Sequence, residues 1–191
     1  LEKYLEGEEI TENELKATFR QGILDARFYP AICCSATKMI GIDTISDIIN
    51  DYMPSPLDRG DWTAKDDKGE DVIISPDPDA EFSGFVFNTI VDPYAGRLSL
   101  FRVISGTLGK EGNVVNTTKD TKERFSQLLE IAGKEQKTIT YALPGSIVAV
   151  AKLKNTLTGD TLTGGKDIQL PAPEPMPPVI SFAISPKSKN D

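Results

Sequence analysis

The spacing of apolar residues changes at residue 82, and this change constrains the fold more than any other feature of the chain. Before it, Ile42, Ile45 and Ile49 recur at the intervals that are typical of one helix face. After it, apolar and polar residues alternate, which is typical of strands with one buried face. We expect one face of the first strand to carry Phe85, Phe87, Thr89 and Val91, and the next strand to carry Leu98, Leu100 and Ile104.

Turn-forming residues divide the alternating region into short segments. These turns are expected at Asp92–Pro93, Gly106, Gly109–Gly112, Pro144–Gly145 and 158–160. Short strands separated in this way favour a closed antiparallel β-barrel. The apolar run at 146–153 is predicted to be its most buried strand. The glycine-rich stretch at 106–112 precedes no helix, so we interpret it as a hairpin turn and not as a phosphate-binding loop.

The first part of the chain has the pattern of an α/β domain. Thr11 and Glu14 form a capping-box motif, which predicts a helix over residues 11–22 that ends near Gly22. The apolar run Phe28–Cys34 predicts a buried strand of a parallel sheet. A second helix is predicted over Gly41–Met53, where Pro54 stops it. One strand cannot form a sheet, so these elements indicate the end of a larger α/β domain.

Four segments follow from these patterns. Residues 1–53 are assigned to the C-terminal part of the α/β domain, and 54–81 to an acidic, proline-rich linker with one short strand at Val72–Ile74. Residues 82–167 form the barrel. Residues 168–191 are read as a proline-rich hinge followed by the first strand of another domain, Val179–Ile184. The fold class is therefore mainly β, with a partial α/β segment before the barrel.

Charge and composition exclude several functions. The net charge is −8, yet residues 82–164 carry ten bases and seven acids, a balance that suits either RNA phosphates or a solvated surface. Without histidine, a His-containing catalytic triad is excluded and a zinc site would lack its usual ligands. The adjacent Cys33 and Cys34 are expected to be reduced thiols.

The ends of the chain and its hydropathy bear on location. No apolar run is long enough to span a bilayer, and the first residues have no signal-peptide pattern, so a cytoplasmic location is expected. The chain begins with Leu and residues 1–10 read like the middle of a helical region. We therefore expect it to be an excised fragment of a longer protein.

Residues 92–106, DPYAGRLSLFRVISG, resemble the signature of the second domain of elongation factor G, the ribosomal translocation GTPase. Residues 157–165 resemble the turn before the last strand of that barrel, in which Asp160 is expected to close a turn and not to bind a metal. Residues 185–191, SPKSKND, resemble the family's entry into its third domain. The stretch after Leu129 departs from the family pattern, which indicates a divergent paralogue.

The resemblance implies a nucleotide-contacting loop at residues 34–38. CSATK is similar to the family's fifth guanine-nucleotide motif, which assigns nucleotide binding to Ser35, Ala36 and Lys38, with Cys34 in place of the usual Gly. The phosphate-loop, magnesium and guanine-reading motifs do not occur in the chain. GTP or GDP with Mg²⁺ is thus expected in the parent protein, which would be a GTPase. No cofactor, metal ligand, catalytic residue or GTP hydrolysis is expected of this segment alone.

The resemblance also implies a partner, the rRNA of the small ribosomal subunit. Lys119, Lys122 and Arg124 lie in a predicted basic loop, where they could either contact phosphates or only solvate the loop. Arg97 and Arg102 lie on opposite faces of a strand. One of them is expected to face a partner, while Arg97 could instead pack on the GTPase domain or pair with Asp92. Aromatic residues do not interleave with these bases, so stacking on single-stranded bases is not supported.

Three functions remain open at this level. The first is a segment of a translocation GTPase that supplies the ribosome-docking barrel and packs on the rest of the GTPase domain, with neither membrane nor DNA as a partner. The second, within the same superfamily, is a ribosomal-protection or release-factor GTPase. The third, of another class, is a stand-alone binding barrel without GTPase activity.

Overall fold

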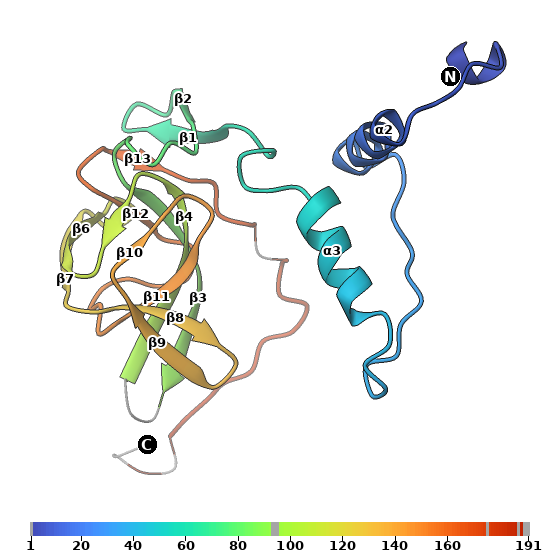
Figure 1. The fold of residues 1–191 in the computed structure, drawn as a ribbon. Coiled ribbons are helices and arrows are strands. Elements are labelled where there is room, and N and C mark those ends of the chain that lie inside the picture. Colours follow the sequence, from blue (N-terminus) through green and yellow to red (C-terminus); the bar gives the residue numbers. More distant parts are fainter. Residues whose placement is uncertain (1, 93–95, 175, 187, 189–191) are drawn as a thin grey trace.

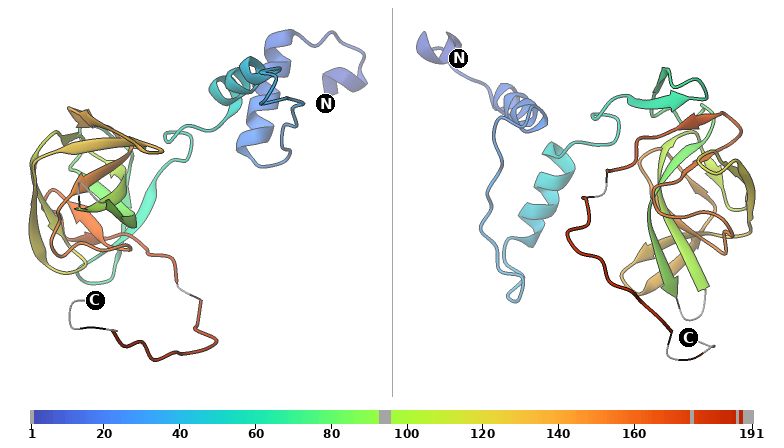
Figure 2. Two further views of the ribbon diagram at one scale, coloured as in Figure 1. Left: turned by 90° about the horizontal axis from the view of Figure 1, so that it is seen from below. Right: turned by 180° about the vertical axis from the view of Figure 1, so that it is seen from behind.

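The chain forms a helical N-terminal region and a larger β-rich region beside it (Figures 1 and 2). The computed structural model describes all residues except 1, 93–95, 175, 187 and 189–191. The helices are α1 (Glu2–Leu5), α2 (Glu12–Leu24) and α3 (Ile42–Tyr52). No helix among the described residues is long and apolar enough to cross a membrane.

Helix α2 begins as the sequence predicts and ends later. Thr11 is its N-cap, and the reciprocal capping box with Glu14 is formed. The helix continues through Gly22 to Leu24, because this glycine makes room for a neighbouring side chain and does not end the helix. A Cβ atom at Gly22 would lie 1.9 Å from Cε1 of Phe28, so only glycine lets the Phe28 ring lie against the helix.

The two longer helices share a cluster of three aromatic rings. The ring centroid of Phe19 on α2 lies 5.3 Å from that of Phe28 and 4.9 Å from that of Tyr52 on α3. Helix α3 itself matches the prediction, with Gly41 as N-cap and Met53 as C-cap. Even so, no residue of α3, all of which the structure describes, is buried. The helical region is therefore held by few contacts.

The buried strand predicted at Phe28–Cys34 is wrong. The segment is extended but belongs to no strand, and most of it is exposed, including Tyr29 at 82%. No sheet lies beside it among the described residues, so its backbone has no strand to pair with. Both Cys33 and Cys34 are free, exposed thiols.

Within the described residues, the β-rich region contains thirteen strands in three antiparallel sheets. They are β1 (Trp62–Asp66), β2 (Asp71–Ile74), β3 (Ser83–Asp92), β4 (Gly96–Ser105), β5 (Leu108–Gly109), β6 (Gly112–Asn116), β7 (Thr121–Phe125), β8 (Leu128–Ala132), β9 (Glu135–Ile139), β10 (Tyr141–Ala142), β11 (Ile147–Ala151), β12 (Thr161–Thr163) and β13 (Ile168–Gln169). The largest sheet has the order β7-β6-β12-β3-β4-β11-β8-β9. It curls around one core, which confirms the predicted barrel-like class (Figure 1). The sequence predicts a closed barrel, but the edge strands β7 and β9 are not paired with each other, so the sheet is not closed by hydrogen bonds.

The alternation predicted for β3 is wrong because the strand contains an irregularity. The register against β4 shifts between Val86 and Asn88. Such a shift reverses which side chains face the core. As a result Val86 is fully buried, whereas Phe87 and Val91 are exposed. The turn predicted at Asp92–Pro93 falls partly on residues outside the described set.

Strands β4 and β11 form the centre of the core. They pair in register from Ile147 with Arg102 to Ala151 with Leu98. Strand β11 is buried in its middle but is not the most buried strand as predicted, because all three residues of β12 are buried. Strand β4 is buried on both faces, where Phe101 and Val103 join one apolar cluster and Leu98 another. The core therefore comes from strands far apart in the sequence.

Two connections differ from their predicted form. The 106–112 stretch is not a hairpin, because β5 pairs with β10 while β6 pairs with β7 and β12. The segment at 54–81 contains two strands and not one, and its hairpin β1–β2 joins β13 in a three-stranded sheet. This small sheet has its own apolar cluster, which includes Ala64, Ile74 and Ile168.

The strand predicted at Val179–Ile184 is also wrong. The segment has no strand structure, and Val179 and Ile184 are 100% and 95% exposed. Figure 2 shows the C-terminal segment running outside the barrel. Four residues of the resemblance at 185–191 lie outside the described residues.

Candidate functional site

The predicted nucleotide loop is a tight turn just before α3. Ser35 and Ile40 form an antiparallel bridge, with backbone N···O distances of 3.0 and 3.1 Å, and the N–H of Met39 donates to the carbonyl of Ala36. Ala36 and Lys38 are exposed at the tip, and Ser35 is half-buried. Within the described part of the chain, the N–H of Ala36 donates no hydrogen bond to a backbone carbonyl.

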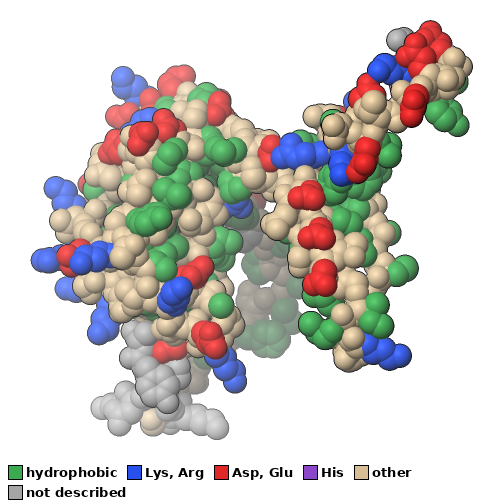
Figure 3. Space-filling model, viewed as in Figure 1, with side chains coloured by type: hydrophobic (Ala, Val, Ile, Leu, Met, Phe, Trp, Pro, Cys, Tyr) green, Lys and Arg blue, Asp and Glu red, His purple; other side chains and the backbone are tan. Residues whose placement is uncertain are grey.

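The predicted basic loop is in fact a turn followed by a strand. Lys119 lies in the turn between β6 and β7, whereas Lys122 and Arg124 lie on β7 itself. Because side chains alternate along a strand, Lys122 and Arg124 share the exposed face and Glu123 between them points inward. Figure 3 shows Lys and Arg side chains gathered at this edge of the barrel.

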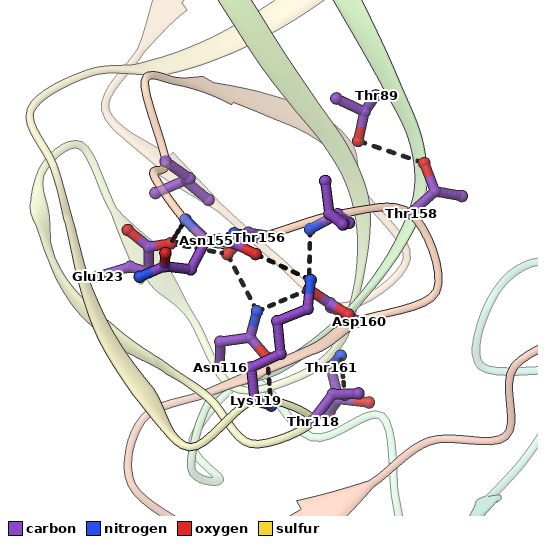
Figure 4. A network of polar contacts seen from close by, with 12 residues as sticks. Thr89, Asn116, Thr118, Lys119, Glu123, Asn155, Thr156, Thr158, Asp160 and Thr161 are labelled. Carbon is purple, nitrogen blue, oxygen red and sulfur yellow. Dashed lines mark hydrogen bonds and ion pairs between the residues drawn. The ribbon is translucent and has the colours of Figure 1, made fainter. Parts of the chain in front are cut away.

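Lys119 does not share that exposed face. Its Nζ lies 2.7 Å from Oδ2 of Asp160 and donates to the carbonyl of Asn155 at 2.8 Å. The same carboxylate oxygen accepts hydrogen bonds from Nδ2 of Asn116 and the N–H of Leu157, each at 2.8 Å (Figure 4). The side chain of Asp160 is 6% exposed. The charge of Lys119 is therefore neutralised within the barrel, where Asp160 closes the turn as predicted.

Glu123 organises the loop between β11 and β12. Its carboxylate accepts hydrogen bonds from three successive backbone N–H groups, those of Lys154, Asn155 and Thr156, at 3.0, 2.6 and 3.1 Å. The Thr156 hydroxyl is a fourth donor (Figure 4). Burial raises the pKa of Glu123, but these hydrogen bonds lower it further, so the net pKa lies below the ordinary value. The loop is thus folded around an internal carboxylate.

The two predicted arginines are separated and differ in role. Arg97 donates from Nη2 to the carbonyls of Leu153 and Lys154, so it supports the same loop from the other side. Arg102 is half-buried on β4, where it pairs in register with Ile147 of β11. Neither lies on β7 with Lys122 and Arg124.

Sequence reasoning missed two cations, Lys152 and Lys154, at the end of β11. They are exposed on either side of the buried Leu153. The available signal was the pair of lysines on either side of one apolar residue directly after the apolar strand. Hydrogen bonds to Glu123 and Arg97 hold the backbone of this loop and therefore fix the backbone positions from which the two lysine side chains extend.

Comparison with known proteins shows that the barrel is similar to a domain of a translation factor. Residues 81–165 match the family model described as "Elongation factor G domain 2". The chain is 41% identical over 189 residues, 98% of its length, to elongation factor G of Neorickettsia sennetsu. A crystal structure of a Thermus thermophilus protein matches 86% of this chain and 22% of its own, with a TM-score of 0.66 and 26% identity.

These matches confirm the resemblance to elongation factor G seen in the sequence. The chain covers 27% of the length of the Neorickettsia protein. Among the residues that the structure describes, no cluster of three or more His, Cys, Asp or Glu side chains could hold a metal ion.

Proposed function

We propose that this chain acts within a translocation GTPase of the elongation factor G type, in which the barrel docks on small-subunit rRNA. One observation carries the proposal: Lys122 and Arg124 lie side by side on the exposed face of β7, and neither forms a salt bridge among the described residues. Unpaired cations on one edge suit a phosphate backbone. The parent protein would use GTP hydrolysis to move tRNA and mRNA.

The helical region supports the assignment of residues 1–53 to the end of a GTPase domain. Met39, Ile40 and Ile49 are exposed, at 72%, 61% and 57%. An apolar surface of this kind is expected where further α/β structure packs on it. Residues 54–81, 82–167 and 168–191 then correspond to linker, second domain and the entry into a third.

The turn at residues 35–40 is proposed to contact the guanine base in the parent protein. The N–H of Ala36 can donate to a base carbonyl, while the bridge between Ser35 and Ile40 holds the turn in shape. GTP or GDP with Mg²⁺ would be held elsewhere through its phosphates. Ala36→Asp in the full-length protein should weaken GDP binding, because it places an acid beside the base carbonyl.

Docking is tested by measuring binding of the chain to purified small ribosomal subunits across a range of salt concentrations. The test variant is Lys122→Gln with Arg124→Gln. Losing two phosphate contacts should reduce the salt slope of log K by about 2 and weaken binding at low salt. The control, Lys134→Gln with Lys137→Gln, removes the same charge from the β8–β9 hairpin.

The control makes the result specific to β7. If both double variants lose affinity equally, only net charge matters and the proposed docking edge is wrong. If the parental chain does not bind small subunits at any salt concentration, the docking function itself is wrong, and a stand-alone binding barrel is favoured.

A further inference from the structure

Lys152 adopts a backbone conformation that disfavours any residue with a side chain. Its φ is 64°, the largest positive value among the non-glycine residues that the structure describes. Glycine takes up this conformation without steric cost, whereas a lysine does not. Such strain at a surface position points to a use for the side chain.

Lys152 borders a groove. The groove has a volume of about 360 Å³ and lies between the β7–β8 turn and the end of β11. Its lining residues are Arg124, Phe125, Ser126, Gln127, Ala151 and Lys152. Two of these residues are cationic, two are polar, and no carboxylate is among them. The amide of Gln127 also donates to the hydroxyl of Thr138 at 2.6 Å.

Arg124 connects this groove to a second hollow. That hollow, of about 470 Å³, is also lined by Lys122 and Asn113. Glu123 borders it too, but its carboxylate is occupied by the N–H groups of the loop at 154–156. Lys122, Arg124 and Lys152 therefore form one cationic track across two adjacent hollows.

The frame of the groove is built by the same contacts that hold the loop. The N–H of Lys152 donates to the carbonyl of Arg97 at 2.9 Å, and the Arg97 side chain donates to Leu153 and Lys154 just beyond. Glu123 fixes the next residues. The Lys152 backbone is consequently held on both sides, and its strained conformation is maintained by the surrounding structure.

We propose that this groove binds a backbone phosphate of RNA, with Arg124 and Lys152 as its two cationic ligands. The RNA source rests on the docking function proposed above. A guanidinium can bind phosphate through two parallel hydrogen bonds, and an ammonium adds a second point charge. Phe125 is 3% exposed, so the groove has no aromatic face on which a base could stack. The chemistry therefore favours phosphate over base.

The decisive variant is Lys152→Gly. It removes the cation and relieves the strain together, so the chain should unfold at the same or a higher urea concentration. Binding to a fluorescein-labelled RNA hairpin, followed by anisotropy, should nevertheless weaken, and the salt slope should fall by about 1. In an NMR titration with inorganic phosphate, the amide signals of Ser126, Gln127 and residue 152 should shift in the parental chain and not in the variant.

Two matched controls separate charge from strain. Lys134→Gln removes one exposed lysine outside the groove, and Asp120→Gly relieves a similar strain, with φ of 49° at that residue, without removing a cation. Neither should weaken RNA binding. If Lys152→Gly binds the hairpin with the parental affinity and salt slope, the groove is not a phosphate site.

Binding to small subunits and binding to the RNA hairpin test the docking edge and the groove separately. Small-subunit binding that depends on Lys122 and Arg124 but not on Lys152 would overturn the groove and keep the docking function. Binding to the RNA hairpin that depends on Lys152, without binding to small subunits, would overturn the docking function and keep the groove as a phosphate site. Binding of a polyglutamate peptide that RNA does not displace would assign the groove to an acidic protein and overturn the proposal.

Discussion

The barrel and the helical region bury their apolar residues to very different degrees. In the barrel, Phe101, Val103 and Leu162 are each at most 1% exposed and belong to one cluster. In helices α2 and α3, which are both described in full, Gly22 of α2 is the only buried residue. Burial of apolar surface is the main stabilising contribution to folding. The barrel therefore holds itself together, whereas the helices leave their apolar side chains exposed or only partly buried.

The two regions also differ in surface charge. Asp43, Asp47 and Asp51 form an acidic stripe along α3, while the cations of the barrel gather near β7 (Figure 3). One chain thus carries an acidic region and a basic edge, which the net charge of −8 conceals. Polyanion binding is expected only at the basic edge.

The largest expected effect is the loss of barrel stability in Phe101→Ala. Removing this fully buried ring should lower the free energy of unfolding by about 3 to 5 kcal/mol. Trp62, the only tryptophan, packs on the small sheet of the β-rich region and reports its unfolding by fluorescence in urea. Phe19→Ala is the matched change in the helices, where it removes the ring contacts with Phe28 and Tyr52.

The two variants should differ in their effect on the Trp62 transition. We expect Phe19→Ala to reduce the helical circular dichroism signal and to leave the Trp62 midpoint in place. An equal shift would mean that helices and barrel unfold as one cooperative unit.

Glu123→Gln is expected to have the second largest effect. The amide keeps one acceptor but loses the charge that three N–H groups share, which should cost about 2 to 3 kcal/mol. In the parental chain the Glu123 pKa is below its ordinary 4.5, so this stabilisation is complete above pH 4.5 and is lost as the pH falls through the folded-state value. The urea midpoint of the parental chain should therefore fall more steeply in acid than that of the variant.

Local patterns predicted the elements whose cause is local. The capping box at Thr11, the helix over 42–52 and the buried strand over 147–151 each depend on residues within the segment itself. The barrel class followed from repeated short strands in the same way. These predictions succeeded because the spacing of apolar residues and the residues that form turns are determined within a few positions of the chain.

Predictions failed where the cause lies elsewhere in the chain. The run Phe28–Cys34 has strand composition but no neighbouring strand in the described part of the chain, and Phe87 is exposed because of a register shift against β4. Among site residues, Lys119 looked equivalent to Lys122. Only the fold brings Asp160, forty-one positions later, to within 2.7 Å of its ammonium group.

The contrast between those two lysines gives the third prediction. Lys119→Ala should destabilise the barrel by about 1 to 2 kcal/mol, because it leaves the carboxylate of Asp160 without its cation. Lys122→Ala should change stability by less than about 0.5 kcal/mol, as is usual for exposed positions. Urea unfolding followed by Trp62 measures both. Equal stabilities would show that the Lys119 contact contributes nothing to the fold.

The smallest expected effect is a loss of stability confined to helix α2. Thr11→Ala removes the hydroxyl that accepts from the N–H of Glu14, which should weaken α2 by about 1 kcal/mol. The Glu14 side chain still accepts from the N–H of residue 11, and hydrogen bonds from Lys3 and then Thr11 lower its pKa to about 2. The remaining half of the cap should therefore persist well below neutral pH. Circular dichroism at low urea should show the lost helix, while the Trp62 transition stays unchanged because the barrel does not depend on α2. If Thr11→Ala moved the Trp62 midpoint, the barrel would draw stability from the helices, and the two regions would not unfold independently.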